Sequence, residues 1–389
     1  MIIKRERNYV LFIIPFMLYF IPKYLEYTTF MGFSDVAQLC SILKTFAYFS
    51  GLLLWLIKSM YYRNVTKRVL FFIVICVIYL SFMAFVNDRK ALFVVVLLSL
   101  LYEDRFKRVF FRDVFAISLV MYIFVIAMAI LHIIPNELVV MNKYGISFSR
   151  LPLGFNYAGQ LTMMFTPLLF MYFYIKGARI TFIDNLIWSL ATFLVFAVSQ
   201  TIMGTFINFI FIVMFNAVKN KKFLHQVKDA IVYIPWLFAI LTAILLFLYS
   251  RNISLVKKLD VLVNGRINLG VEMSNIYGIR LLGTTFENNT IDFYQYLDSE
   301  YMHMFVGEGI LFTIFALIVG CYIIKYCLYK GDRFALLIWI MVFFNAMFNN
   351  GIYNLVMNPF GIVVVEAIRY NLSNNKFGNK VLRFRISYD

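Results

Sequence analysis

The chain has 389 residues, of which 62% are hydrophobic and only 14% are charged. A soluble domain of this length has too little interior for so much apolar surface. Apolar runs of about 18 residues or more recur along the chain, which is typical of membrane-spanning helices. The formal net charge of +16 would suggest nucleic acid in a soluble protein, but basic residues of membrane proteins mark cytoplasmic loops, so we expect no nucleic-acid partner.

About twelve transmembrane helices are predicted, so the expected fold is an all-α polytopic integral membrane protein. The predicted spans are Tyr9–Tyr24, Val36–Leu56, Val69–Val86, Ala91–Tyr102, Val114–Ile134, Gly159–Ile175, Phe182–Val198, Met203–Val218, Ala230–Tyr249, His303–Ile324, Phe334–Phe348 and Ile352–Ile368. Several are shorter than the roughly 20 residues needed to cross alone, and the third and fourth fit a broken or re-entrant pair. The basic and then apolar start lacks a signal-peptide cleavage site, so we expect it to remain as the first helix.

The basic residues support this topology. With the N-terminus inside, 25 of the 36 lysines and arginines fall in cytoplasmic segments, 10 fall outside, and Lys44 lies within a span. Such an asymmetry predicts that both termini are cytoplasmic. Within a single transmembrane domain of residues 1–389, two outer segments stand out. One covers residues 135–158, and the larger covers 250–302 between the ninth and tenth spans.

Familiar catalytic and metal-binding signatures are absent from the sequence. The three histidines are scattered, no two cysteines form a Cys-x-x-Cys pair, and no glycine-rich phosphate loop occurs. We therefore predict no cofactor and no metal site.

The candidate site residues are charged or polar groups of the outer segments. SRLPLGFNYAGQ carries Arg150 and Asn156, VLVNGRINLG carries Arg266, and GIRLLG carries Arg280. Arginine presents a planar fork of donors that suits phosphate oxygens. The alternative is that these arginines are interfacial anchors for lipid headgroups.

A second group of candidates lies in DSEYMHMFVGEGI, where the large outer segment meets the tenth span. It contains Asp298, Glu300, Tyr301 and His303. A carboxylate here can take a proton from an attacking sugar hydroxyl. The alternative is that Asp298 is a polar helix cap. Glu308 lies about a turn inside the predicted span, where ionisable groups are functional candidates.

The order of these motifs in this topology resembles the Wzy/O-antigen ligase superfamily of membrane glycosyltransferases. The matching residues are Arg150, Gly154, Phe155 and Asn156 in a first motif, Gly265, Arg266 and Gly283 in a second, and Asp298, Ser299, Tyr301 and Gly309 in a third. The chain departs from the family pattern where Ala158 and Ser299 replace the usual asparagines. The resemblance covers most of the chain from Arg150 onward, in loose motifs whose order is more specific than any one of them.

The resemblance implies a polymerase in the bacterial inner membrane that joins undecaprenyl-pyrophosphate-linked repeat units into O-antigen or capsule-like polysaccharide. Arg150 and Arg266 would bind the pyrophosphate and Asp298 would act on the attacking hydroxyl, with no metal required. The other substrate-binding candidates are Arg280, Asn156, Tyr301, Glu300 and His303. The expected partners are the lipid-linked donor and acceptor, membrane lipids and a chain-length-regulating co-polymerase.

Two alternatives to polymerisation stay open. An O-antigen ligase shares the donor chemistry, but ligases usually place histidine where Asp298 stands. A flippase for the same lipid-linked sugar would commonly show internal repeats and polar sites at the bilayer midplane, and neither is evident in this sequence.

Overall fold

The structure is a computed structural model that describes residues 2–61, 90–143, 146–219, 230–284 and 298–373. Eight helices in this part of the chain are long and apolar enough to cross a membrane. The prediction of a largely helical, multi-pass membrane protein is confirmed at this level. The described chain separates into two compact units, which are treated individually below.

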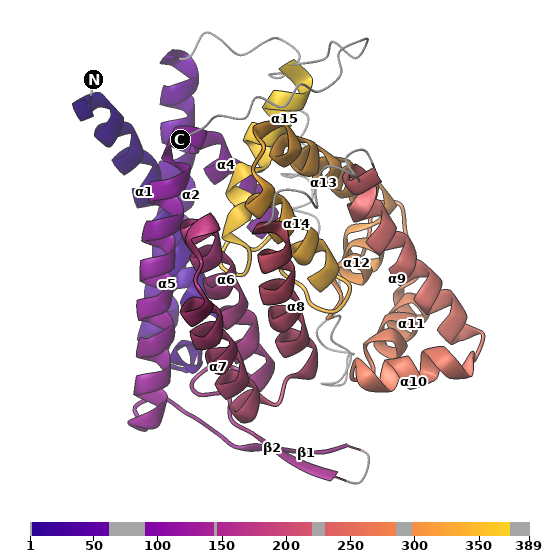
Figure 1. The fold of residues 1–389 in the computed structure, drawn as a ribbon. Helices are drawn as coiled ribbons and strands as arrows, with labels where there is room; N and C mark the ends of the chain where they lie inside the picture. Colours follow the sequence, from indigo (N-terminus) through magenta and orange to yellow (C-terminus); the bar gives the residue numbers. More distant parts are fainter. Residues whose placement is uncertain (1, 62–89, 144–145, 220–229, 285–297, 374–389) are drawn as a thin grey trace. The chain divides into compact units, whose positions relative to one another are not determined.

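The first unit comprises Met1–Asn64, Val94–Lys219 and Asn354–Ile362. Its elements are α1 (Ile2–Leu25), α2 (Ser34–Tyr61), most of α4 (Lys90–Leu101), α5 (Lys107–Ile130), β1 (Val139–Lys143), β2 (Ile146–Arg150), α6 (Ala158–Lys176), α7 (Phe182–Ser199) and α8 (Ile202–Lys219) (Figure 1). Aromatic rings fill its interior. Phe12, Phe16 and Phe110 are fully buried and pack ring to ring, with the centroids of Phe16 and Phe110 4.9 Å apart.

The second unit comprises Val65–Phe93, Asn220–Tyr353 and Val363–Asp389. Its described helices are α9 (Ile234–Ser250), α10 (Ser254–Leu262), α11 (Arg266–Tyr277), α12 (Glu300–Met302), α13 (Ile310–Lys330), α14 (Arg333–Asn345) and α15 (Val364–Ser373). Figure 1 draws α10 crosswise to α9, with α11 folded back beside them. The large outer segment, residues 250–302, thus contains three short helices in its described part, namely α10, α11 and α12.

The eight long helices correspond to the first, second and fifth to tenth predicted spans. The third predicted span lies outside the described residues. The fourth and eleventh coincide with α4 and α14, which are helices of only 12 and 13 residues. A short apolar helix of this length does not cross a bilayer alone.

The twelfth predicted span, Ile352–Ile368, is wrong as a continuous helix. Turns replace it up to residue 358, a 3-10 helix covers Pro359–Val363, and α15 begins only at Val364. Asparagine side chains compete for backbone hydrogen bonds here: Asn354 Oδ1 accepts from the Val356 amide at 3.0 Å. Pro359 then lacks the amide proton that a helix would need.

The start of the tenth span also differs from the prediction. A π-helical turn, His303–Glu308, precedes Gly309, whose φ of 91° ends it, and α13 then runs from Ile310 to Lys330. An L side chain rarely adopts this φ, so the glycine sets the boundary. The long helix α13 therefore begins seven residues after the predicted start of the span at His303.

The first outer segment contains an antiparallel β-hairpin, which the all-helical prediction did not include. Val139 pairs with Arg150 at its open end, and Lys143 pairs with Ile146 near its tip. The alternating sequence ISFSR suits a short strand with two different faces.

Lys44, the basic residue inside a predicted span, is paired with Glu26. The same carboxylate accepts from Lys23 Nζ at 2.5 Å. Burial raises the pKa of the Glu26 carboxyl, but the ammonium groups of Lys23 and Lys44 more than offset this effect and hold that pKa below its ordinary value. A lysine in α2 is thus compensated by an acid just beyond the end of α1.

A capping box begins α7. Asp184 Oδ2 accepts from the Thr181 amide at 2.8 Å, while Thr181 Oγ1 accepts from the Asp184 amide at 3.2 Å. Asp184 Oδ1 also accepts from Tyr172 at 2.5 Å and Lys176 at 2.6 Å, both on α6. The buried carboxylate therefore ties the end of α6 to the start of α7.

We expect Asp184→Ala to destabilise this junction by about 2 kcal/mol, because the cap is lost and polar partners on α6 and at Thr181 lose their acceptor. Asp184→Asn, which keeps one acceptor oxygen, should cost less. Thermal unfolding of the detergent-solubilised protein measures both. Equal melting temperatures for wild type and Asp184→Ala would contradict the assigned role.

Candidate functional site

A short helix–turn–helix fixes Arg266 in the second unit. After α10, Gly265 adopts φ 78° and its amide donates to the Asp260 carbonyl at 2.8 Å. The Asp260 carboxylate then accepts from the amides of Ile267 at 2.8 Å and Asn268 at 3.2 Å. These amides belong to the first turn of α11, which otherwise lacks acceptors. Asp260 thus caps the helix that Arg266 begins.

Arg266 and Asp298, the central residues of the second and third motifs, form an ion pair. Arg266 Nε donates to Asp298 Oδ2 at 2.9 Å, although 32 positions separate them in sequence. The arginine side chain is 13% exposed and the aspartate side chain 34% exposed. The next residue, Ser299, is the cap of α12, so the alternative that Asp298 itself caps this helix is not what the structure shows.

Only part of the Arg266 guanidinium is engaged by the described residues. Its Nη1 is buried and has no hydrogen-bond partner among them. A buried donor without an acceptor costs on the order of 1–3 kcal/mol, and more for a charged group. This cost favours a ligand oxygen or an ordered water at that nitrogen.

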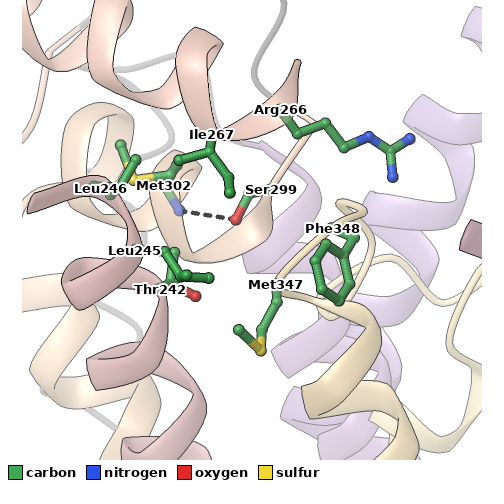
Figure 2. A pocket seen from close by; sticks show the side chains of 9 residues that line it. All are labelled: Thr242, Leu245, Leu246, Arg266, Ile267, Ser299, Met302, Met347 and Phe348. Atoms are coloured by element: carbon green, nitrogen blue, oxygen red, sulfur yellow. Dashed lines mark hydrogen bonds between the residues drawn. The ribbon is translucent and has the colours of Figure 1, made fainter. Parts of the chain in front are cut away.

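A small cavity lies beside Arg266. Its volume is about 20 Å³, room for about one water molecule, and α9, α11, α12 and the segment after α14 contribute its walls. Figure 2 shows the Phe348 ring near the Arg266 side chain, with the hydrogen bond from the Met302 amide to Ser299 Oγ at the centre. The lining is Thr242, Leu245, Leu246, Arg266, Ile267, Ser299, Met302, Met347 and Phe348.

Two glycines bring the remaining parts of these motifs into backbone contact. Thr284 N donates to the Gly307 carbonyl at 3.0 Å, and Ile310 N donates to the Arg280 carbonyl at 3.1 Å. A Cβ on Gly283 would lie 2.1 Å from the Gly307 oxygen, and one on Gly309 would lie 2.2 Å from the Gly283 nitrogen. The residues after α11 therefore cap α13 at a separation that only glycine allows.

The other predicted site residues of this unit lie in different surroundings. Glu300 is buried and its carboxylate accepts from the Gly351 amide. Tyr301 is fully buried and donates to the Phe343 carbonyl at 3.3 Å; burial raises the pKa of its phenol well above the usual value. His303 Nδ1 lies 3.7 Å from Glu308 Oε1, and the Arg280 side chain is exposed. Tyr301 thus occupies a core position, while Arg280 is open to a ligand.

The predicted residues of the first motif belong to the other unit. Arg150 Nη2 donates to the Gln200 carbonyl at 3.0 Å, in the turn between α7 and α8. Asn156 Nδ2 donates to the Glu26 carbonyl at 2.8 Å, and its amide donates to the Tyr27 carbonyl at 3.2 Å. These contacts fasten the motif to the segment after α1. Arg150 and Asn156 thus have structural partners within the first unit.

Backbone conformation and close packing require glycine at position 154 of the first motif. Gly154 has φ 82°, and a Cβ there would lie 2.6 Å from Ile134 Cδ1. Its carbonyl accepts from the Thr29 amide at 2.9 Å, and the neighbouring Phe155 is fully buried. The Gly-Phe pair therefore holds the chain between α5 and the turn after α1.

Sequence reasoning missed Asp260 and the segment after α14. Asp260 stands beside the lysines of α10, and no helix was predicted in residues 250–302 that it could cap. The Ala346 carbonyl accepts from the Glu300 amide at 3.0 Å and from Ser299 Oγ at 3.3 Å. Backbone groups of this kind carry no sequence signature.

We expect Asp260→Ala to lower the stability of the α10–α11 turn by about 1 kcal/mol, because the first-turn amides of α11 lose their cap. Arg266 should then lose its fixed position, reducing any activity that depends on it by about tenfold or more. Asp260→Asn keeps the capping oxygen and should restore most of both. Thermal unfolding and turnover of the three proteins test this; equal losses in the alanine and asparagine variants would contradict a capping role.

Comparison of the chain with protein families, curated proteins and solved structures finds no match in any of the three.

Proposed function

We propose that the chain is a membrane glycosyltransferase that polymerises polyprenyl-pyrophosphate-linked oligosaccharide repeat units. The observation that carries the proposal is the ion pair between Arg266 and Asp298. It joins an arginine, whose N–H groups suit phosphate oxygens, to a carboxylate that could accept a proton. The two residues come from separate sequence motifs. The pair lies in the loop predicted to face the outer leaflet, where a lipid pyrophosphate presents its head group.

The chemistry suits the two side chains. The unpartnered, buried Nη1 of Arg266 is available to a phosphate oxygen, and a fixed cation there would stabilise the negative charge that develops on a departing pyrophosphate. Asp298 is about one-third exposed, so its carboxylate is accessible to an incoming hydroxyl. In this proposal, neighbouring side chains bind the phosphate and accept the proton of the hydroxyl.

The proposed step balances as follows. The acceptor hydroxyl oxygen attacks the anomeric carbon of the donor, and the bond from that carbon to the pyrophosphate oxygen breaks. The pyrophosphate lipid leaves with the electron pair, held by Arg266, and the hydroxyl proton passes to Asp298. A new glycosidic bond and one free polyprenyl pyrophosphate result from each turnover.

The test uses the purified full-length chain in proteoliposomes with the lipid-pyrophosphate-linked repeat unit extracted from the producing cells. We expect a ladder of lengthening glycans and release of one polyprenyl pyrophosphate per linkage. The matched control is Arg112→Ala, because Arg112 is an arginine with a 67% exposed side chain in the first unit. It should leave the ladder unchanged, whereas Arg266→Ala should remove it.

Two other outcomes would overturn the proposal. Movement of the intact lipid-linked sugar across the bilayer, with no ladder, would identify a flippase. Transfer of the glycan as one block to added lipid A core, with no growth of the repeat, would identify a ligase.

A further inference from the structure

The short helix α10 presents an apolar edge that no described residue covers. Leu255 is 74% exposed and Leu262 is 66% exposed, and seven positions separate them, which places them on one side of a helix. The preceding Ile253 is 43% exposed. Val256 and Asp260, on the opposite side of α10, are buried. The helix therefore packs against its own unit through that side and leaves Leu255 and Leu262 exposed.

Basic side chains share the exposed surface of α10. Lys257 and Lys258 are both exposed, and so is Arg251 at the start of the turn. The acid of this helix, Asp260, is buried and its carboxylate is occupied by the α11 amides. The accessible part of α10 therefore combines leucines with two lysines and exposes no carboxylate. Long basic side chains on such a helix place their stems along lipid and their charges at phosphates.

The position of α10 in the chain is also consistent with contact to lipid. It follows α9, a predicted membrane span, after only three residues and runs crosswise to it (Figure 1). A helix lying across the end of a span is parallel to the membrane plane and at the depth of the headgroups. Farther along the loop, Ile279 and Leu281 are 53% and 58% exposed, so the apolar surface does not end with α10.

We propose that α10 is an interfacial helix that binds anionic phospholipids of the bilayer around it. Leu255 and Leu262 insert between acyl chains, and Lys257 and Lys258 contact lipid phosphates. Amphipathic helices with apolar and lysine-bearing faces bind lipid surfaces in this way. The inference does not depend on the glycosyltransferase proposal, because it concerns the attachment of the loop to the bilayer and not its chemistry.

The first test places single cysteines at Leu255, Leu262 and, as a polar control, Glu272 of α11, in a chain whose four native cysteines are alanine. Each is spin-labelled in proteoliposomes of phosphatidylcholine and phosphatidylglycerol. Collision with oxygen, which concentrates in lipid, is compared with collision with a water-soluble nickel chelate. We expect the labels at positions 255 and 262 to collide more often with oxygen, and the label at position 272 to collide more often with the nickel chelate.

The other outcomes of this test overturn the proposal. Strong nickel collision at 255 and 262 would place the leucines in water. Weak collision with both reagents would show that protein, such as a second copy of the chain, covers them.

The second test keeps the native cysteines and compares the wild type with Lys257→Gln/Lys258→Gln. The share of phosphatidylglycerol in the lipid that copurifies with each protein is measured at low and high salt. We expect the preference for the anionic lipid at low salt to fall by up to roughly fivefold per lysine removed. An unchanged preference would overturn the lysine–phosphate contact. The double variant Arg112→Gln/Lys219→Gln, which removes two positive charges from the other unit, controls for net charge.

Discussion

Replacing Arg266 by alanine is expected to lower the rate of glycan polymerisation by about two to three orders of magnitude, the usual cost of removing one fixed donor from developing charge. Arg266→Lys keeps the positive charge but loses the planar fork that bonds Asp298 through Nε while Nη1 stays available. It should therefore recover only a small part of the rate. Release of polyprenyl pyrophosphate by the purified protein compares the wild type with both variants.

A double-mutant cycle separates the roles of the two partners. If Asp298 accepts the proton, Asp298→Asn alone should slow the chemical step strongly and leave the apparent affinity for the lipid donor nearly unchanged. If Asp298 only orients Arg266, adding Asp298→Asn to Arg266→Ala should cost nothing further. Wild-type turnover in Arg266→Ala, with Arg112→Ala as the reference, would refute the assignment of the site.

The second large effect is expected at Gly309. Gly309→Ala must place a Cβ 2.2 Å from the Gly283 nitrogen and 2.6 Å from the Leu281 oxygen, and neither backbone atom belongs to a side chain that can turn away. Its φ of 91° adds strain for any L residue. We expect a loss of about 3 kcal/mol or more, because overpacking against backbone adds to the conformational cost.

The matched control for this variant lies at the other end of the same helix. Gly331 has φ 65°, but nothing lies within 4 Å of the position its Cβ would take. Gly331→Ala should therefore carry only the conformational cost, about 1–2 kcal/mol. Thermal unfolding in detergent compares the two. Similar melting temperatures for both variants would show that the contact between Gly283 and Gly309 is not as close as the structure has it.

Local sequence determined the long helices of this protein. A segment such as Phe182–Val198 begins at a capping box and is predominantly apolar after its first turn, so both burial in lipid and backbone hydrogen bonding favour a helix. The same reasoning failed over Ile352–Ile368, where composition is apolar but asparagine side chains and Pro359 interrupt the helical hydrogen bonds. Hydropathy reports the environment of a segment and not whether its backbone can stay regular.

The sequence also selected Arg266 and Asp298 as candidates, from residue chemistry and order in the chain. That they meet at 2.9 Å was decided by the tertiary structure, through the Asp260 cap that sets α11 and the close passage of Gly283 along Gly309. The contact between Gly283 and Gly309 joins distant residues through backbone atoms, which every residue carries alike. A linear pattern can therefore name the reacting groups, whereas only folding determines which of them become neighbours, because that depends on backbone geometry.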